Sequence, residues 1–241
     1  MSGNPINNIP PQAEKHSLHA RVLYSDNHLI AVNKLPGEIV QGDKTGDMPL
    51  SELVAAYLKV LMNKPGDAFV GVIHRIDRPV SGVVLFARTG KGLSRLNEQF
   101  RDRKISKTYY ALVEGNVSQP EGKLIHFLVK NEARNTSRAV SETTAGALRS
   151  ELSFRVVQHF DRYTLLEVNP ITGRHHQIRV QLSAAGWIIK GDVKYGAKRA
   201  NRDKSICLHA RSLRFTKATG DETVQVEAPL PGTADWLGLD F

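Results

Sequence analysis

The chain contains the segment His74-Arg75-Ile76-Asp77-Arg78-Pro79-Val80-Ser81-Gly82-Val83-Val84-Leu85-Phe86-Ala87, in which a charged loop leads directly into an apolar run. Pro fixes φ and Gly tolerates a positive φ, so Pro79 and Gly82 predict irregular backbone in the loop. The run from Gly82 to Ala87 lacks polar alternation, which predicts a strand buried on both faces. Such a strand would hold Asp77 rigidly at its edge.

Asp77 is the first candidate for chemistry, because Arg75 and Arg78 flank it and guanidinium groups favour an ionised carboxylate. An ionised carboxylate is a ready nucleophile or base. Most Asp residues between arginines, however, form surface ion pairs that contribute little to stability. Ion-pair networks without a catalytic role also perturb pKa values. The charge pattern alone therefore does not separate catalysis from a structural ion pair.

Elsewhere in the chain, hairpins outnumber helices. Hairpins are predicted over 22–32 and 152–168, further strands over 107–113, 207–215 and 223–227, and helices over 47–63, 89–104 and 172–185. Asp47 and Thr172 are the expected caps of two of these helices, and Val60 is expected on a buried face. Short strands and a mobile loop around 131–138 are expected within 117–150. The pattern indicates an α+β fold with a mainly antiparallel sheet.

The composition favours a nucleic-acid partner. The 241 residues carry a net charge of +9, with a pI near 9.7. Basic residues gather in two runs, 88–107 and 190–217, and such clustering in a strongly basic protein is typical of nucleic-acid binders. No apolar stretch approaches the ~18 residues of a membrane span. Residues 1–17 are predicted to be a disordered tail without signal-peptide character, so we expect a cytoplasmic protein whose residues 18–241 form a single domain.

Several alternative motifs can be dismissed on spacing. His74-Arg75-x-Asp77 has one residue more than the kinase His-Arg-Asp loop, and Ser81 lacks the G-x-S-x-G context of a nucleophile. No glycine-rich phosphate loop is present. Adjacent helical residues such as His175 and His176 diverge by about 100° and seldom share an ion. Cys207 stands alone, which excludes a disulfide framework and predicts a packed thiol. No metal site is therefore expected, and a His/Asp site assembled in space is the one alternative that the spacing leaves open.

Six colinear motifs resemble the RluA-type RNA pseudouridine synthases. The first is the Asp77 loop itself. The others are Asn33-Lys34-Leu35-Pro36-Gly37, Lys107 to Val113, Thr172 to Arg179, Gly191 to Gly196, and Leu208-His209-Ala210. They follow one another in the order and spacing of the family over residues 20–230. The departures are Leu35, Gln181 and Thr216-Lys217, none of which falls on a catalytic position. The helical RNA-binding domain often found at the N-terminus of the family is expected to be missing.

The resemblance implies a mainly antiparallel sheet with flanking helices, split by a central basic cleft, and a reaction that needs no cofactor or metal. Asp77 would be the nucleophile, paired with Arg179, while Tyr109 would stack on the target uracil. Arg75 would fill the gap left by the flipped nucleotide, and Leu208 would pack on the other face of the base. The implied RNA contacts also include Lys34, Arg174, His176 and Lys194.

The expected function is therefore the isomerisation of specific uridines to pseudouridine in structured RNA, ribosomal or transfer, by a monomer. Two alternatives belong to other classes. A catalytically idle RNA-binding protein on the same fold would need no carboxylate in a basic cleft. A metal-dependent nuclease would need an acidic cluster.

Overall fold

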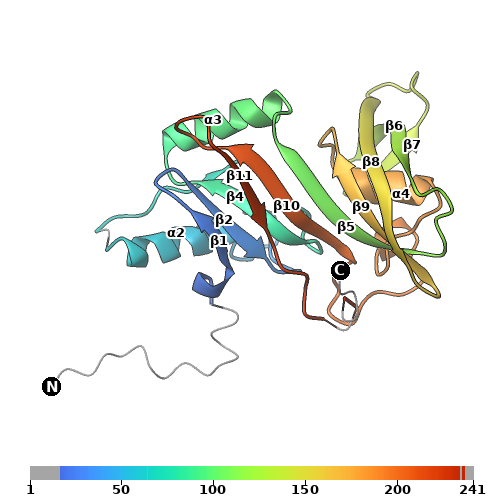
Figure 1. Cartoon of the computed structure of the whole chain (residues 1–241), viewed down its shortest axis with the longest axis horizontal. Helices are drawn as coiled ribbons and strands as arrows, with labels where there is room; N and C mark the ends of the chain where they lie inside the picture. Colours follow the sequence, from blue (N-terminus) through green and yellow to red (C-terminus); the bar gives the residue numbers. More distant parts are fainter. Residues whose placement is uncertain (1–16, 64, 234, 237–241) are drawn as a thin grey trace.

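The computed structural model describes residues 17–63, 65–233 and 235–236. Within them, one mixed sheet of 11 strands has the order β1-β2-β4-β10-β5-β9-β8-β6-β7, with β3 beside β4 and β11 beside β10 (Figure 1). All the strand pairs in this sheet are antiparallel except β10 with β4. The predicted α+β class with a mainly antiparallel sheet is confirmed. The predicted tail lies outside the described residues, apart from Ser17.

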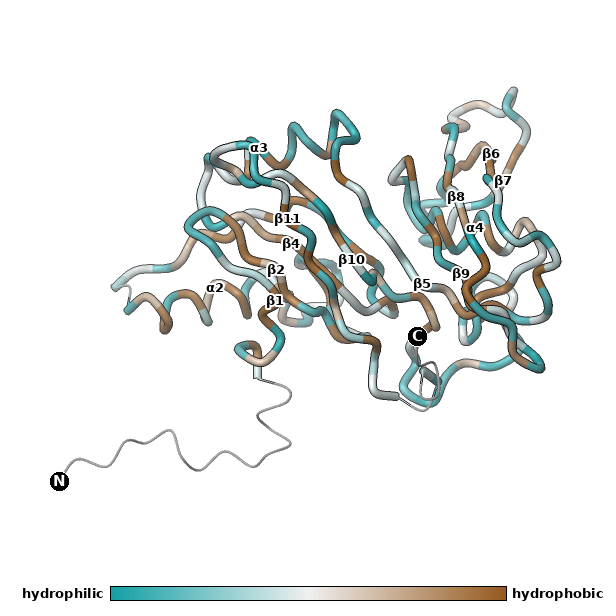
Figure 2. Tube along the Cα trace, in the orientation of Figure 1, coloured by the Kyte–Doolittle hydropathy of each residue, from teal (hydrophilic) through white to brown (hydrophobic). Residues whose placement is uncertain are grey.

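The N-terminal half of the sheet is covered by a helix on each face. Its elements are η1 (His19–Arg21), β1 (Val22–Ser25), β2 (Leu29–Lys34), α2 (Leu50–Leu61), β3 (Gly71–Val72), β4 (Ser81–Ala87), α3 (Gly90–Arg101), β10 (Leu208–Thr216) and β11 (Thr223–Glu227). On one face of the sheet, Ile30 and Val84 belong to the same hydrophobic cluster as the buried residues of α2. On the other face, their chain neighbours Leu29 and Val83 belong to a second cluster with Leu96 of α3. This double coverage explains why β4 is apolar at successive positions, and Figure 2 shows β2 and β4 as predominantly hydrophobic.

Close backbone approach joins β4 to β10 at the foot of the Asp77 loop. Gly82 has a φ of 114°, and a Cβ at this position would lie 2.2 Å from the carbonyl oxygen of Ala210. The Ser81 Oγ and His209 Nδ1 atoms lie 2.8 Å apart in a buried hydrogen bond between the same two strands. The parallel pairing therefore requires glycine at position 82, and it fixes where the loop ends.

The C-terminal half of the sheet shares β5 with the first half. Its elements are β5 (Ser106–Glu114), β6 (Glu121–Asn131), β7 (Thr136–Val140), β8 (Leu148–His159), β9 (Tyr163–Pro170), α4 (Gln177–Ala184) and η2 (Val193–Tyr195). The prediction of short strands within 117–150 holds only for β7, because β6 and β8 are long strands that pair over eight positions. The supposed loop at 131–138 is a tight turn that β7 enters at Thr136. Polar alternation hid these strands, since only one of their faces is well buried.

Three predicted helix features are corrected by the structure. Helix α2 begins at Leu50 after an extended Pro49, so Asp47 does not cap it. Val60 is 82% exposed, because the buried face of this helix runs through Leu50, Val54 and Leu58. Helix α4 begins only at Gln177, five residues after Thr172. Thr172 Oγ1 instead donates to Oε1 of Gln177 over 2.7 Å. The helix predicted over 89–104 is present as α3, which Thr89 caps, and the buried thiol of Cys207 agrees with the prediction.

Helices long and apolar enough to cross a membrane are absent from the described part of the chain.

Candidate active site

Asp77 lies in the irregular segment between β3 and β4, with its side chain 27% exposed. The amide of Val80 donates to the Asp77 carbonyl over 3.0 Å and closes a turn. Two distant segments hold the loop from outside, since Gly37 N–H donates to the Arg78 carbonyl and Ile206 N–H donates to the Pro79 carbonyl. The carboxylate is thus presented to solvent from backbone that is fixed on both sides.

Lys34 supports the loop from beneath and does not face RNA. It has no exposed surface, and its ammonium group donates to the carbonyl oxygens of Leu35, Arg78 and Val80 over 2.7–3.0 Å. Burial lowers the pKa of Lys34 to about 7, against the opposing attraction of Glu38 and Asp77. The prediction that Lys34 contacts RNA is therefore wrong in this structure, because all three of its N–H groups are used inside the protein.

Arg179 connects Asp77 to a second, deeply buried carboxylate. Its Nη1 donates to Oδ2 of Asp77 over 2.9 Å, while Nε and Nη2 form a bidentate pair with Asp192 at 2.7 and 2.8 Å. Arg179 is 5% exposed and Asp192 1% exposed. Burial alone would lower the pKa of Arg179, but the hydrogen bonds and charges of Asp192 and Asp77 outweigh it and raise that pKa. The guanidinium is therefore fixed before any substrate arrives.

The guanidinium that contacts Asp77 comes from α4 and not from the neighbouring arginines. Arg78 turns away and pairs with Asp47 at 2.6 Å and with Asp43 at 3.6 Å. Arg75 is exposed. The interpretation of Asp77 as a carboxylate between two flanking guanidinium groups is therefore corrected, whereas the resemblance-based pairing with Arg179 is present in the structure.

A chain of hydrogen bonds orients His176 toward the same carboxylate. The Tyr195 hydroxyl accepts from the Ser137 amide at 2.9 Å and forms a hydrogen bond of 2.7 Å with Nδ1 of His176. The Nε2 atom of His176 lies 3.6 Å from Oδ2 of Asp77. Burial lowers the pKa of His176 to about 3, so the ring is neutral at pH 7. His176 has a φ of 52° directly before α4, a conformation that places it outside the helix.

Tyr109 and Leu208 lie on the two central strands beside this group. Register pairs Tyr109 of β5 with Ala210 of β10, and Ala111 with Leu208, so Tyr109 and Leu208 share one face of the sheet. Burial, together with the nearby charge of Asp77, raises the pKa of Tyr109, and its hydroxyl stays protonated at neutral pH. Leu208 is 3% exposed. Tyr109 thus offers an aromatic ring near the carboxylate, whereas Leu208 is buried in the structure.

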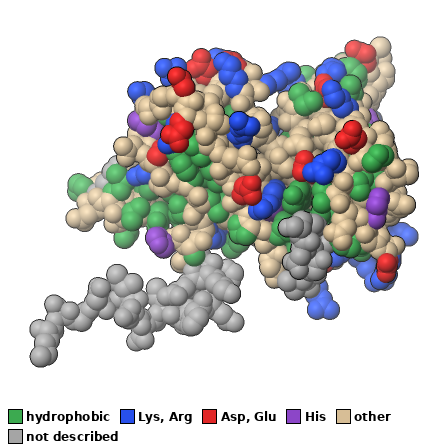
Figure 3. Space-filling model, in the orientation of Figure 1, with side chains coloured by type: hydrophobic (Ala, Val, Ile, Leu, Met, Phe, Trp, Pro, Cys, Tyr) green, Lys and Arg blue, Asp and Glu red, His purple; other side chains and the backbone are tan. Residues whose placement is uncertain are grey.

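The other predicted RNA contacts are at the surface. Arg75, Arg174 and Lys194 are all exposed, and Lys194 donates to the Asn135 carbonyl over 3.2 Å. The structure does not bring them into contact with Asp77. Figure 3 shows Lys and Arg side chains scattered over both halves of the visible face and mixed with Asp and Glu.

Two residues of the site were missed as individual candidates. Asp192 and Tyr195 lie within the Gly191 to Gly196 motif, whose resemblance to the family was the available signal. Gly191 has a φ of 85°, and a Cβ there would lie 2.7 Å from the Asn201 side chain, so the turn that delivers Asp192 requires glycine. In the described residues, no three His, Cys, Asp or Glu side chains gather in a way that could hold a metal ion.

Comparisons with known proteins identify the family and the fold. A sequence profile described as RNA pseudouridylate synthase matches residues 28–184. The ribosomal large subunit pseudouridine synthase C of Vibrio vulnificus (strain CMCP6) is 32% identical over 215 residues, which are 87% of this chain and 65% of that protein. The enzyme of the same name from Escherichia coli (strain K12) is 34% identical over 231 residues, 92% of this chain and 70% of that protein. The chain thus spans about two thirds of the length of these relatives.

Solved structures share the fold. The structure of human RNA pseudouridylate synthase domain containing 4 superposes with a TM-score of 0.76 and 22% identity, covering 91% of this chain and 92% of that one. Human RNA pseudouridylate synthase domain containing 1 gives a TM-score of 0.72 and 24% identity, covering 98% of this chain and 89% of that one. The chain belongs to the RNA pseudouridylate synthase family, which confirms the resemblance.

Proposed function

We propose that the protein converts uridine to pseudouridine in RNA, with Asp77 as the nucleophile. The observation that carries this proposal is a partly exposed carboxylate held by a buried Arg179–Asp192 ion pair, at 2.9 Å from the guanidinium. Pure RNA binding would gain nothing from a carboxylate fixed at the surface of a basic protein, because it repels phosphate. The names of the relatives favour RNA of the large ribosomal subunit as the substrate.

In the proposed reaction, Asp77 attacks either carbon 1′ of the ribose or the uracil ring, and the bond between N1 and carbon 1′ breaks. The base then rotates, and carbon 5 forms the new bond to carbon 1′. The bond between Asp77 and the substrate breaks, which restores the free carboxylate. Carbon 5 loses a proton and N1 gains one, so the product is an isomer of the substrate. Arg179 aims the attacking oxygen, and its fixed position reduces the reorganisation required in the transition state.

The target uridine must leave its helix to reach Asp77, because its reacting atoms lie inside the stack. Exposed Arg75, two residues before the nucleophile, is suited to fill the vacated space. Tyr109 offers a stacking surface with a protonated hydroxyl, and Leu208, which is buried on the same face of the sheet, supports an apolar floor beside it. A neutral base gains from contacts of this kind with aromatic and apolar side chains.

The test is the release of tritium from RNA labelled at carbon 5 of uracil, using ribosomal RNA from cells that lack this gene. Wild-type protein is expected to release tritium, and Asp77→Asn is expected to release none while still binding RNA. Asp221→Asn, on the exposed turn before β11, makes the same chemical change away from the site and is expected to behave as wild type.

Tight, salt-sensitive RNA binding by wild type without tritium release would favour the idle RNA-binding protein instead. Cleavage of the RNA that EDTA abolishes would favour the nuclease. Equal release by wild type and Asp77→Asn would overturn the assignment of the nucleophile.

A further inference from the structure

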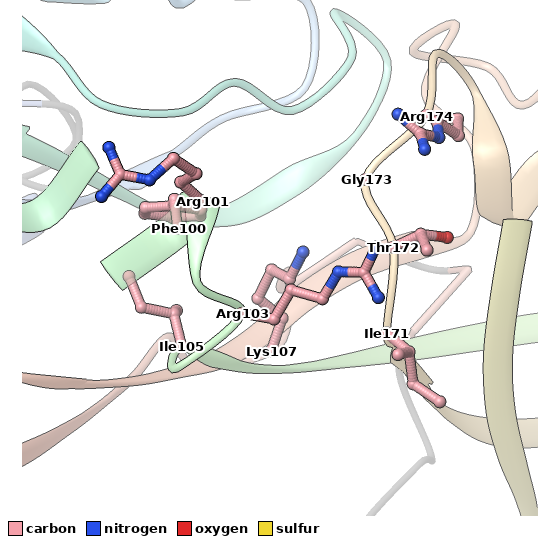
Figure 4. Close-up of a pocket in the computed structure, with 9 residues that line it drawn as sticks. All are labelled: Phe100, Arg101, Arg103, Ile105, Lys107, Ile171, Thr172, Gly173 and Arg174. Atoms are coloured by element: carbon pink, nitrogen blue, oxygen red, sulfur yellow. The ribbon is translucent and has the colours of Figure 1, made fainter. Parts of the chain in front are cut away.

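A cationic pocket lies outside the Asp77 group, between the end of α3 and the segment that follows β9. It is lined by Phe100, Arg101, Arg103, Ile105, Lys107, Ile171, Thr172, Gly173 and Arg174. Four of these nine residues are Lys or Arg, and none is Asp or Glu. In Figure 4, Arg103 extends from the α3–β5 connection and Lys107 from the start of β5 on one side, and Arg174 comes from the β9–α4 connection on the other.

Lys107 has no anion to balance it. Within the described part of the chain its ammonium group makes no hydrogen bond or ion pair, and it lies 3.8 Å from where a Cβ of Gly173 would be. Burial lowers the pKa of Lys107 accordingly. Shielded ammonium groups are normally paired, because losing hydration without a partner is costly. The side chains of Arg103 and Arg174 likewise make no ion pair among the described residues, whereas Arg101 contacts Asp102.

The pocket adjoins the site through both of the segments that form it. Lys107 precedes Tyr109 by two residues on β5, so the two side chains share a face of the strand at a spacing of about 7 Å. Arg174 precedes His176 by two residues in the segment leading into α4. An anion held in the pocket would therefore lie beside a base stacked on Tyr109.

We propose that this pocket binds a backbone phosphate of the RNA, from a nucleotide next to the target uridine; the inference rests on the proposed function. Phosphodiester groups match the lining, because Arg binds phosphate oxygens through its planar fork and Lys through a compact charge. Gly173 leaves the Lys107 ammonium group uncovered by a side chain at this point. The pocket thereby sets which nucleotide reaches Asp77.

The test is the salt dependence of binding to a single-stranded 12-nucleotide oligouridylate, compared between wild type and Lys107→Met. Each phosphate contact on a single strand contributes about 0.7 to the slope of log affinity against log salt. The slope is expected to fall by about 0.7 in Lys107→Met, and by about 1.4 when Arg103→Met is added. Lys123→Met removes the same charge from an exposed position on β6, outside the pocket and outside both basic runs, and is expected to retain the wild-type slope.

Lys107→Arg distinguishes loss of charge from a change in structure. It retains the positive charge and is therefore expected to retain the wild-type slope of log affinity against log salt. In the tritium assay, Lys107→Met is expected to raise KM at least fivefold and to change kcat less than twofold. An unchanged slope in Lys107→Met would overturn the proposal. Calorimetric binding of inorganic phosphate that Lys107→Met abolishes, with no change in the RNA slope, would define a free-phosphate site and also overturn it.

The two proposals fail separately. A wild-type protein that releases no tritium counts against the isomerase, yet a reduced slope in Lys107→Met would still support the phosphate site. Normal turnover by wild type with an unaltered slope in the variant removes the phosphate site alone.

Discussion

At the scale of single residues, Arg179 is bound by two carboxylates of different character. Asp77 is partly exposed, whereas Asp192 is 1% exposed and takes two of the three hydrogen bonds from the guanidinium. Removing one partner of a buried ion pair typically costs about 3–5 kcal/mol. Arg179→Ala is therefore expected to lower the free energy of unfolding by about that amount as well as to abolish turnover. It cannot by itself test how Asp77 is oriented.

Asp192→Asn is the better variant for testing how Asp77 is oriented. An amide can still accept one hydrogen bond from Arg179, but it no longer fixes the guanidinium by charge and by two bonds. We expect kcat to fall about 100-fold, because small displacements of a catalytic group have effects of that size. RNA affinity should be unchanged, as measured by filter binding beside the tritium assay. Glu167→Gln breaks the Arg155–Glu167 pair on the C-terminal half of the sheet and serves as the matched control. A loss of affinity with kcat retained would contradict the positioning role of Asp192.

The sequence could predict that Asp77 and Arg179 pair but not how deeply each predicted site residue is buried. The colinear motifs correctly indicated that Asp77 and Arg179 would meet, although 102 positions separate them. They could not reveal that Lys34 lies under the loop, because a lysine in a motif looks the same whether it binds RNA or backbone carbonyls. Nor could Arg78 be predicted to turn toward Asp47, since that contact depends on the path of the segment before α2.

At the scale of elements, Gly82 determines whether β4 and β10 can pair. Gly82→Ala places a Cβ 2.2 Å from the Ala210 carbonyl oxygen and also forces an L residue to a φ of 114°. Gly220→Ala imposes a positive φ of 76° in open space. The control should lose about 1–2 kcal/mol of unfolding free energy from the backbone alone, and Gly82→Ala clearly more. Urea unfolding measures the difference, and equal losses would show that the strands can separate without cost.

The elements that sequence patterns predicted best are those with uniform burial. Strand β4 has seven buried residues in succession, and its apolar run has no alternative explanation. The start of helix α4 was predicted too early because Thr172 is a residue type typical of N-caps. In the structure its hydroxyl donates to the Gln177 side chain, and the residues between them form a turn. A left-handed residue such as His176 before a helix has no signal in residue type.

At the scale of the whole molecule, buried histidines link stability to pH. His209 is fully buried between β4 and the segment after β11, where Nε2 donates to the Ala228 carbonyl and Nδ1 accepts from the Ser81 hydroxyl. Burial lowers the pKa of His209 to about 4, and that of His176 to about 3. In the unfolded chain both rings take up a proton near pH 6.5, which the folded protein resists.

The free energy of unfolding is therefore expected to fall as the pH drops from about 6.5 toward 4, by about 1.4 kcal/mol per pH unit for each of these two groups. Above pH 7 both rings are neutral in either state, and their contribution levels off. Urea unfolding at pH 7.5, 6.0 and 5.0 measures the slope. His209→Gln, whose amide can both donate and accept, should be less sensitive over this range, whereas His159→Gln on the exposed end of β8 should match the wild type. A wild-type protein equally stable at pH 7.5 and 5.0 would mean that these rings protonate as easily in the folded protein as in the unfolded chain.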